Sequence, residues 1–377
     1  MDNNYLQLSG DNPFGSQAKM LLHWDRLNEY MQTGDTLCPI FMEVGLTNRC
    51  NESCVWCITE NGRDNIHGES LDIEILKKFQ KEFKEIGGKA ITYAGQGEPT
   101  FYKYFEQAVI QAKEVGLQLG MMTNGIFKSK YIDLIGKSFK WMRISLDTLD
   151  EEKYTNYKGV NGPPVIKKHI QALKDYPVKV GINVNVGTEY TVQEAKNIVE
   201  WIFEDDAVDY LQVRPILPRY YKPDERDNLE LNEEVWEYFD SLGHHPKLNL
   251  SNDKRMELEN KTVFNFRSCE GHFFEPILDA TGEIKICTYH PGNQKFSFGN
   301  IYEKSFADIW RGKQRQKSIN FVRRVKYDKI CQMCCKCSEV NKLIDYLTHP
   351  EEMVDVILFN KNFKGIYYGY RKIKTLY

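Results

Sequence analysis

Six short apolar segments alternate with amphipathic segments between Pro39 and Ile216, and this alternation limits the folds open to the chain. The apolar segments are residues 39–46, 89–95, 117–123, 141–147, 178–186 and 208–216. Each is bounded by turn residues and rich in apolar or β-branched side chains, which predicts buried strands. Strands that alternate with helices form parallel βα units. We therefore expect an α/β fold, either an incomplete barrel or an open doubly wound sheet.

The first amphipathic segment, ESLDIEILKKFQKEFKEIGG, predicts a helix because its apolar side chains recur at helical spacing. Ser70 is placed to cap the start of this helix, and Gly87 is placed to close its end. A later segment, SFADIWRGKQRQKSINFVRR, also predicts a helix. We expect its basic side chains to form a solvated helix face rather than a docking surface for an acidic partner.

Polar or otherwise unusual residues stand at the end of every predicted strand. The first strand runs into CNESCVWC, the second into GQGEP and the third into TNG. The last three strands carry Arg143, Ser145, Asp147, Asn183, Asn185, Gln212 and Arg214. In parallel α/β folds the carboxyl ends of the strands share one face, where active sites lie. The sequence therefore predicts one site at this face.

The ten cysteines are clumped. The groups are Cys50, Cys54 and Cys57, and then Cys269, Cys287, Cys331, Cys334, Cys335 and Cys337. Cys38 stands alone, and we interpret it as a small buried hydrophobe. The chain starts without the features of a signal peptide and has no run of eighteen apolar residues, so we expect a cytoplasmic protein without a membrane span. In a reducing compartment, clumped cysteines predict metal ligands.

Three thiolates in CNESCVWC leave one metal position open, since a structural zinc site closes with four ligands. A zinc knuckle completed by a distant ligand is the alternative. The spacing Cys50-x3-Cys54-x2-Cys57, with Trp56 before the last cysteine and six βα units behind it, resembles the signature of radical S-adenosylmethionine (SAM) enzymes. The resemblance implies a partial (β/α)6 barrel and a [4Fe–4S] cluster with one iron open to SAM. Reductive cleavage of SAM then yields a 5′-deoxyadenosyl radical that abstracts hydrogen from carbon.

The resemblance extends to GQGEP, which is similar to the family's GGEP element. That element contacts the methionine ammonium of SAM. Gly97, Glu98 and Pro99 match it, whereas Gln96 stands where the first glycine is usual, and Gly95 is placed to relieve the difference.

Other residues receive roles from the same resemblance. Ser145 and Asp147 resemble the ribose contacts of the fourth strand, and Trp56 is expected to lie against the adenine. Further candidates for SAM binding are Asn124 and Asn185. Arg214 is the candidate catalytic residue, placed to reach into the pocket and hold an anionic or oxygen-rich substrate.

The second cysteine group resembles the auxiliary-cluster extension of the SPASM/Twitch subfamily. Six thiolates are too few for two further cubane clusters, so the resemblance implies one auxiliary [4Fe–4S] cluster of the Twitch type. Its expected ligands are Cys269, Cys287, Cys331 and Cys334. Cys337 is an alternative to Cys334, and Cys335 has no assigned role. A structural zinc site with the same four ligands is the other interpretation.

These features divide the chain into five parts. We expect an N-terminal helical extension (1–38), the partial barrel (39–216), a linker with a helix (217–264), a small α+β Twitch-like domain (265–342) and a C-terminal tail (343–377). The Twitch-like domain begins with a β-hairpin around residues 280–282 that ends at Cys287.

The predicted reaction is hydrogen abstraction from a small hydroxylated substrate (a sugar, nucleotide sugar or aminocyclitol), giving dehydrogenation or epimerisation. An external donor such as flavodoxin or ferredoxin is expected to supply the electron. Modification of a peptide or protein side chain is the alternative, which the short segment of 38 residues before the first strand disfavours. A zinc or iron–sulfur regulator that binds nucleic acid is a third interpretation. The occupied strand ends argue against it, and the net charge of −3 supports neither side.

Overall fold

The computed structural model describes residues 20–57, 68–217, 230–259, 266–290, 292–325 and 337–349. These residues fall into two compact units. The larger unit contains the described residues of 36–264 and 272–335, and the smaller unit contains those of 1–35, 265–271 and 336–377. The predicted division of the chain into five parts stays a prediction.

The described strands of the larger unit form one sheet with the order β10-β9-β8-β1-β2-β3-β4-β5-β6-β7. Its parallel strands are β1 (Phe41–Val44), β2 (Ala90–Tyr93), β3 (Gln118–Thr123), β4 (Phe139–Ser145), β5 (Lys179–Val186), β6 (Tyr210–Pro215) and β7 (Leu248–Leu250). Each predicted strand is present, and the α/β partial-barrel fold is confirmed.

A hairpin continues the sheet beyond β1. β8 (Ile277–Leu278) pairs with β1 in parallel, and β9 (Glu283–Lys285) and β10 (Ser297–Asn300) follow in antiparallel order. The predicted hairpin around residues 280–282 is therefore confirmed. Its attachment to the barrel sheet was not predicted, because two-residue β8 is too short to show a strand pattern.

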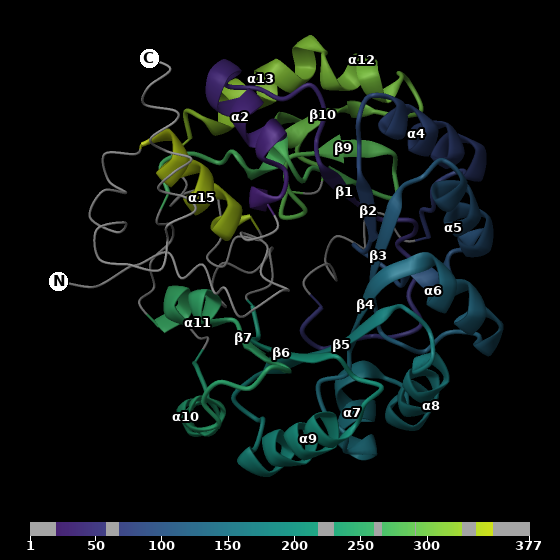
Figure 1. The fold of residues 1–377 in the computed structure, drawn as a ribbon, viewed down its shortest axis with the longest axis vertical. Helices are drawn as coiled ribbons and strands as arrows, with labels where there is room; N and C mark the ends of the chain where they lie inside the picture. The colour runs from purple at the N-terminus through teal and green to yellow at the C-terminus, as the bar shows by residue number, and fades with distance from the viewer. Residues whose placement is uncertain are drawn as a thin grey trace. The chain divides into compact units, whose positions relative to one another are not determined.

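Helices follow the outer side of the curved sheet (Figure 1). They are α4 (Ile73–Glu85), α5 (Phe105–Glu114), α6 (Ile132–Ser138), α7 (Glu151–Lys158), α8 (Pro163–Leu173) and α9 (Val192–Glu204), with short 3₁₀ turns η1 (Pro99–Phe101) and η2 (Ser129–Tyr131). The larger unit also contains α10 (Glu233–Ser241), α11 (Asn252–Glu259), η5 (Gln294–Phe296), α12 (Phe306–Trp310) and α13 (Lys313–Val322). The smaller unit contains α2 (Trp24–Thr33) and α15 (Ser338–Thr348). None of the helices in the described ranges is long and apolar enough to cross a membrane.

The two faces of the sheet differ in what they contact. The Tyr93 hydroxyl donates to the carbonyl of Ala108 on α5, and Ile144 lies near Ile166 of α8 across Gly125, so these side chains face the helices. Residues between them in the strands point to the opposite, inner face, which we call the lumen face. The lumen-facing residues at positions 143, 145, 212 and 214 are partly exposed, while Ile144 and Val213 between them are buried. The lumen face is therefore partly open to solvent at these positions.

Two helix predictions need correction. Asp72, not Ser70, caps α4: its carboxylate accepts from the backbone N–H groups of Glu74 and Ile75. Ser70 is engaged elsewhere, because its hydroxyl lies 2.7 Å from the Thr47 hydroxyl. The predicted closure of α4 at Gly87 agrees with the structure, where this glycine has a φ of 112°.

The segment predicted as one basic helix is two helices, α12 and α13, separated at Gly312. A side chain there would lie 3.1 Å from the Ile309 carbonyl. The expectation of a solvated basic face is wrong for Arg315, which is 1% exposed. Its guanidinium lies 3.9 Å from the ring centre of Trp310. This position is a cation–π contact in the core rather than a surface charge.

Candidate active site

The loop after β1 carries the first three cysteines, Cys50, Cys54 and Cys57. The backbone N–H of Glu52 donates to the Cys50 sulfur at 3.4 Å, and the Cys57 N–H donates to the Cys54 carbonyl at 3.1 Å. In the part of the chain that the structure describes, no disulfide joins the cysteines. In these same ranges no three His, Cys, Asp or Glu side chains converge on one metal ion. A cubane cluster places no such demand, since each cysteine binds a different iron.

The end of α7 supports this cysteine loop. The backbone N–H groups of Ser53 and Val55 donate to the carbonyls of Lys158 and Tyr157, at 2.8 and 3.0 Å. The Trp56 ring packs against the Tyr157 ring, with centroids 4.7 Å apart. Trp56, predicted to contact adenine, is thus held at the surface of the loop, and its contact with SAM stays a prediction.

A buried carboxyl group lies inside the cysteine loop. Glu52 accepts a hydrogen bond from the Tyr154 hydroxyl at 2.7 Å and another from the Cys54 sulfur at 3.3 Å. Burial raises the pKa of Glu52, and the charge of Lys158 opposes this rise. Burial also raises the pKa of the Cys54 thiol. Sequence reasoning missed Glu52 and Tyr154, because nothing in their local pattern distinguishes them from ordinary surface residues.

The GQGEP segment packs directly on the start of the cysteine loop. The Glu98 N–H donates to the Arg49 carbonyl at 2.9 Å. A side chain at Gly97 would lie 2.6 Å from the Thr47 carbonyl oxygen, so only glycine fits there. Gly95 has a φ of 121°, which a glycine adopts without strain. These contacts explain the glycines of the segment.

Glu98 joins the ends of β2 and β3. One carboxylate oxygen accepts from the hydroxyls of Thr100 and Thr123, at 2.6 and 2.8 Å, and the other accepts from the Asn124 N–H at 2.8 Å. Burial raises the pKa of Glu98, whereas these hydrogen bonds act to lower it. Pro99 begins η1 and is buried. The predicted contact of this segment with the methionine ammonium stays a prediction.

Asn124 connects the end of β3 to the cysteine loop. Its side-chain amide donates to the Asn51 side chain at 2.7 Å, and Asn51 in turn donates to the Ile126 carbonyl at 2.9 Å. The third strand end and the cysteines are therefore in one hydrogen-bonded assembly.

Asp147 occupies the end of β4 with a φ of 63° and is 1% exposed. One of its oxygens accepts from the backbone and side-chain N–H groups of Asn185, both at 2.8 Å. Its other oxygen lies 2.5 Å from the Lys158 amine. Two predicted site residues, Asp147 and Asn185, are thus brought together, and Lys158 was missed. The roles predicted for them in SAM binding stay predictions.

Polar residues continue along the lumen face. Ser145, Asn183 and Gln212 are paired in register on β4, β5 and β6, so they share this face. Arg214 lies one lumen position beyond Gln212 and is partly exposed. The side-chain oxygen of Asn183 is buried and has no hydrogen-bond partner among the described residues. It lacks a donor that a bound molecule would supply.

These residues fit an iron–sulfur cluster and SAM. Three soft thiol ligands lie in one loop beside backbone and side-chain donors, and on the adjoining lumen face the buried oxygen of Asn183 has no partner among the described residues.

The auxiliary cysteines are described only in part. Cys287 lies in the larger unit, Cys269 and Cys337 lie in the smaller unit, and Cys331, Cys334 and Cys335 lie outside the described residues. Within the smaller unit, Cys337 is buried, and a side chain added at Gly271 would lie 2.7 Å from its Cβ. The ligand set of the auxiliary cluster stays a prediction.

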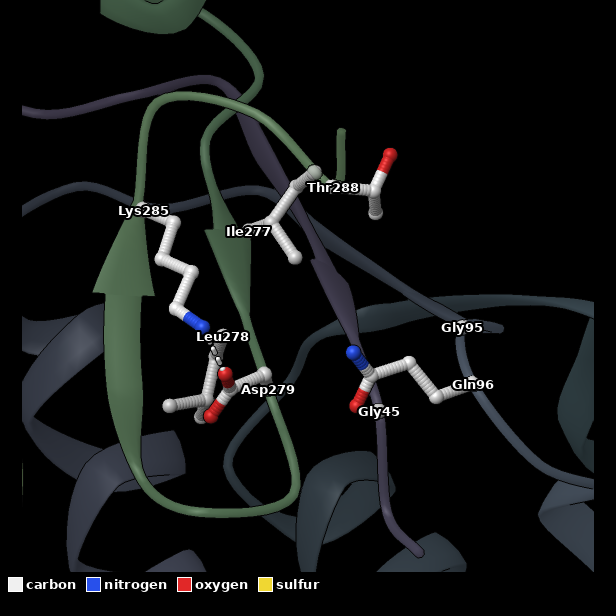
Figure 2. Close-up of a pocket in the computed structure, with 8 residues that line it drawn as sticks. All are labelled: Gly45, Gly95, Gln96, Ile277, Leu278, Asp279, Lys285 and Thr288. Atoms are coloured by element: carbon white, nitrogen blue, oxygen red, sulfur yellow. Dashed lines mark ion pairs between the residues drawn. The ribbon is translucent and has the colours of Figure 1, made fainter. Parts of the chain in front are cut away.

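A small cavity lies where β8 joins β1, and Figure 2 shows the residues around it. Lys285 points to Asp279 and forms an ion pair with it (Figure 2). The cavity holds about 10 Å³, the lower limit for one water molecule. It is too small for a substrate.

Two family models match the chain. The radical SAM superfamily matches residues 44–202, and the SPASM iron–sulfur cluster-binding domain matches residues 269–338. The chain belongs to the radical SAM superfamily and carries a SPASM domain, which confirms the resemblance found in the sequence. The cofactors of these domains are [4Fe–4S] clusters and SAM, as predicted.

Three known proteins illustrate the similarity. A probable GTP 3′,8-cyclase from Archaeoglobus fulgidus is 27% identical over 47% of this chain and 60% of its own length. A tungsten-containing aldehyde ferredoxin oxidoreductase cofactor-modifying protein from Pyrococcus furiosus is 25% identical over 79% of this chain and 87% of its own. The structure of Streptococcus suis SuiB bound to precursor peptide SuiA matches with a TM-score of 0.61 and 17% identity, over 86% of this chain and 75% of that one.

These matches have defined limits. The chain spans 60% and 48% of the lengths of the first two curated relatives, both GTP 3′,8-cyclases. The likeness to SuiB shows the fold alone. The chain therefore carries a radical SAM domain, and the similarities leave its substrate open.

Proposed function

We propose that this radical SAM enzyme abstracts hydrogen from a carbon of a small hydroxylated molecule bound at the lumen face, giving dehydrogenation or epimerisation. The cluster and SAM together supply a 5′-deoxyadenosyl radical when bound. Cys50, Cys54 and Cys57 would hold the cluster, and the residues at the ends of β2, β4 and β5 would hold SAM.

The observation that carries this proposal is the polar lumen face next to the cysteine loop. Ser145, Asn183 and Gln212 share one level of the sheet, and the buried oxygen of Asn183 has no partner among the described residues. Hydroxyl groups of a substrate are donors that would satisfy it. A wholly apolar substrate would leave this oxygen unpaired, at a cost in binding free energy.

In this proposal the lumen residues orient the substrate. For dehydrogenation, the substrate radical loses one proton and one electron, and the auxiliary cluster of the SPASM domain would accept the electron. For epimerisation, a donor such as a thiol on the opposite side of the carbon would give a hydrogen atom to the substrate radical, and the external reductant would restore the donor with one electron and a proton from solvent. An external flavodoxin or ferredoxin would reduce the SAM-binding cluster.

The names of the similar proteins suggest other substrate classes for this chain. GTP is the substrate named for the cyclases, and SuiB is named with a precursor peptide. Modification of a peptide is therefore the alternative to a small substrate.

The test is transfer of deuterium into 5′-deoxyadenosine. The anaerobically reconstituted, reduced enzyme is incubated with deuterated sugars, nucleotide sugars and aminocyclitols, with deuterated GTP, and with deuterated peptides. We expect deuterium in recovered 5′-deoxyadenosine only with a hydroxylated small molecule. Transfer only from peptides would establish the alternative, and transfer from none of these compounds would contradict the proposal.

A further inference from the structure

Arg143 projects from the middle of β4 onto the lumen face, where it is paired in register with Met122 of β3. Its guanidinium donates to the Gln212 side-chain oxygen at 3.3 Å and approaches the Met122 sulfur at 3.2 Å. The first distance is long for an N–H···O bond, and a thioether is a weak acceptor. A guanidinium has five N–H donors, so most of those of Arg143 have no acceptor among the described residues.

No carboxylate of the described residues lies within ion-pair distance of Arg143. Burial lowers the pKa of Arg143, the nearby charge of Arg214 lowers it further, and Tyr210 and Glu43 act in the opposite direction. Arg143 is only partly exposed, and cations that are partly removed from water are normally paired. The barrel therefore holds a positive charge that an anion would compensate.

The side chain of Gln212 is oriented so that its oxygen accepts a hydrogen bond from Arg143. Its amide nitrogen donates to the Ser251 hydroxyl at 2.7 Å, which directs its oxygen to Arg143. Arg214 lies on the same strand and face, two residues further toward the carboxyl ends. Within the described ranges, Arg214 also has no ion-pair partner. Two guanidinium groups thus face the lumen from β4 and β6.

The unpaired oxygen of Asn183 belongs to the same region. Asn183 is 5% exposed and lies between Ser145 and Gln212 in register. Its oxygen accepts hydrogen bonds, whereas the arginines donate them. The lumen face therefore offers complementary partners for one molecule that carries both a negative group and a hydroxyl or amine donor.

We propose that Arg143 and Arg214 form a binding subsite for a negatively charged group of the substrate, a carboxylate or a phosphate, with Asn183 accepting a hydrogen bond from an adjacent donor. This inference rests on the proposed function, in that it takes the lumen face as the place where the substrate binds. It narrows the substrate class to anionic hydroxylated molecules. Planar guanidinium groups pair with carboxylates and phosphates through two parallel hydrogen bonds.

The test measures anion binding to the reconstituted holoenzyme, without any radical reaction. Inorganic phosphate and acetate are titrated separately at constant ionic strength, and the midpoint of thermal unfolding is recorded. Binding to the folded state raises this midpoint in a saturable way. The variants are Arg143→Gln, Arg214→Gln and the control Lys140→Gln, which removes one exposed charge from the same strand.

We expect saturable stabilisation of the wild type and of Lys140→Gln by at least one of the two anions, and which anion acts distinguishes a phosphate from a carboxylate substrate. The apparent dissociation constant should rise by about tenfold or more in Arg143→Gln, as for loss of one charged partner. Without added anion, Arg143→Gln should unfold at the same temperature as the wild type or higher, because it removes a partly buried charge that has no ion-pair partner among the described residues.

Equal stabilisation of all variants by both anions, or of none, would overturn the inference. A lower midpoint for Arg143→Gln with and without anion would show that the residue has only a structural role. SAM affinity, measured by equilibrium dialysis, should be the same in the wild type and in Arg143→Gln; a tenfold loss there would show that the arginine binds the carboxylate of SAM instead. Failure of the proposed function appears separately, as absence of deuterium transfer with anion binding intact.

Discussion

The amine of Lys158 and the carboxylate of Asp147 form an ion pair of 2.5 Å in which the two side chains are 3% and 1% exposed. Lys158 ends α7, whose last turn supports the cysteine loop, while Asp147 lies two residues beyond β4 and binds Asn185 of β5. Burial alone would lower the pKa of Lys158, but the charges of Asp147, Cys54 and Glu52 raise it above its ordinary value. The pair therefore fastens the cysteine loop to the strand ends.

The first prediction concerns this pair. Replacing Lys158 with Met leaves the carboxylate of Asp147 buried without its cation, which we expect to cost about 3–5 kcal/mol of unfolding free energy. Urea denaturation measures the loss. Lys137→Met is the control: its amine binds Asp133 at 2.6 Å, but the two side chains are 62% and 59% exposed, so that variant should lose much less stability than Lys158→Met.

The double variant Lys158→Met with Asp147→Asn removes both charges. It should be more stable than Lys158→Met alone, because no uncompensated charge remains. Additive losses in the double variant would show that the two charges do not interact in the folded protein.

The second prediction concerns two glycines beside the cysteine loop. Gly97→Ala would bring a methyl group to within 2.6 Å of the Thr47 carbonyl oxygen, and the nearest atoms are all backbone atoms of residues 47–49, which cannot move aside as a flexible side chain could. We expect a loss of about 1–3 kcal/mol in stability and incomplete assembly of the SAM-binding cluster. Gly45→Ala is the control, since its nearest neighbours would lie at 3.6 Å, an ordinary contact distance.

Iron and sulfide analysis after anaerobic reconstitution measures cluster assembly in both variants. Gly45→Ala should bind as much iron as the wild type. Full iron content in Gly97→Ala would contradict the close packing of GQGEP against the cysteine loop.

The strand pattern and the motifs at strand ends could be predicted from the sequence because each is local. The apolar run of residues 178–186 is enough by itself to predict a strand. The cysteine spacing of CNESCVWC is likewise enough to predict metal ligands. The structure then places CNESCVWC beside GQGEP, as parallel βα topology requires.

The remaining features depend on contacts between distant residues. Ser70 and Asp72 are both good capping residues, and the contact of Ser70 with Thr47 decides between them. Arg143 and Gln212 lie 69 positions apart, so no local pattern shows that they meet on the lumen face. In the sequence, Lys158 is an ordinary lysine near a helix end, and only the structure shows its ion pair with Asp147.

The third prediction concerns the buried carboxyl of the cysteine loop. Tyr154→Phe removes the hydrogen bond to Glu52 and leaves that carboxyl short of a donor. We expect a loss of about 1–3 kcal/mol. Tyr157→Phe is the control, because the contact of Tyr157 with Trp56 is made by the ring and survives loss of the hydroxyl. Urea denaturation compares the two, and equal stability of both variants would contradict a structural role for the Tyr154 hydroxyl.

The last prediction concerns pH and Glu194, which caps α9 with Thr191 and binds Lys153. Burial would raise the pKa of Glu194, but hydrogen bonds from Lys153, Thr191 and Thr148 lower it below its ordinary value of 4.5. A carboxyl whose pKa is lower in the folded state stabilises the fold above the unfolded value and loses this effect as pH falls through the folded value. Glu194→Gln should therefore be less stable than the wild type at pH 7, and the difference should shrink as pH falls below 4.5.

Glu151→Gln, at the exposed start of α7, is the control. Its stability relative to the wild type should depend less on pH, since the Glu151 carboxylate has no ion pair within the described residues. Unfolding free energies of each variant and of the wild type, measured from pH 3 to 8 with about half-unit spacing, resolve the two pH dependences. If the difference between Glu194→Gln and the wild type does not change with pH, the charge of Glu194 contributes nothing to the stability of the fold.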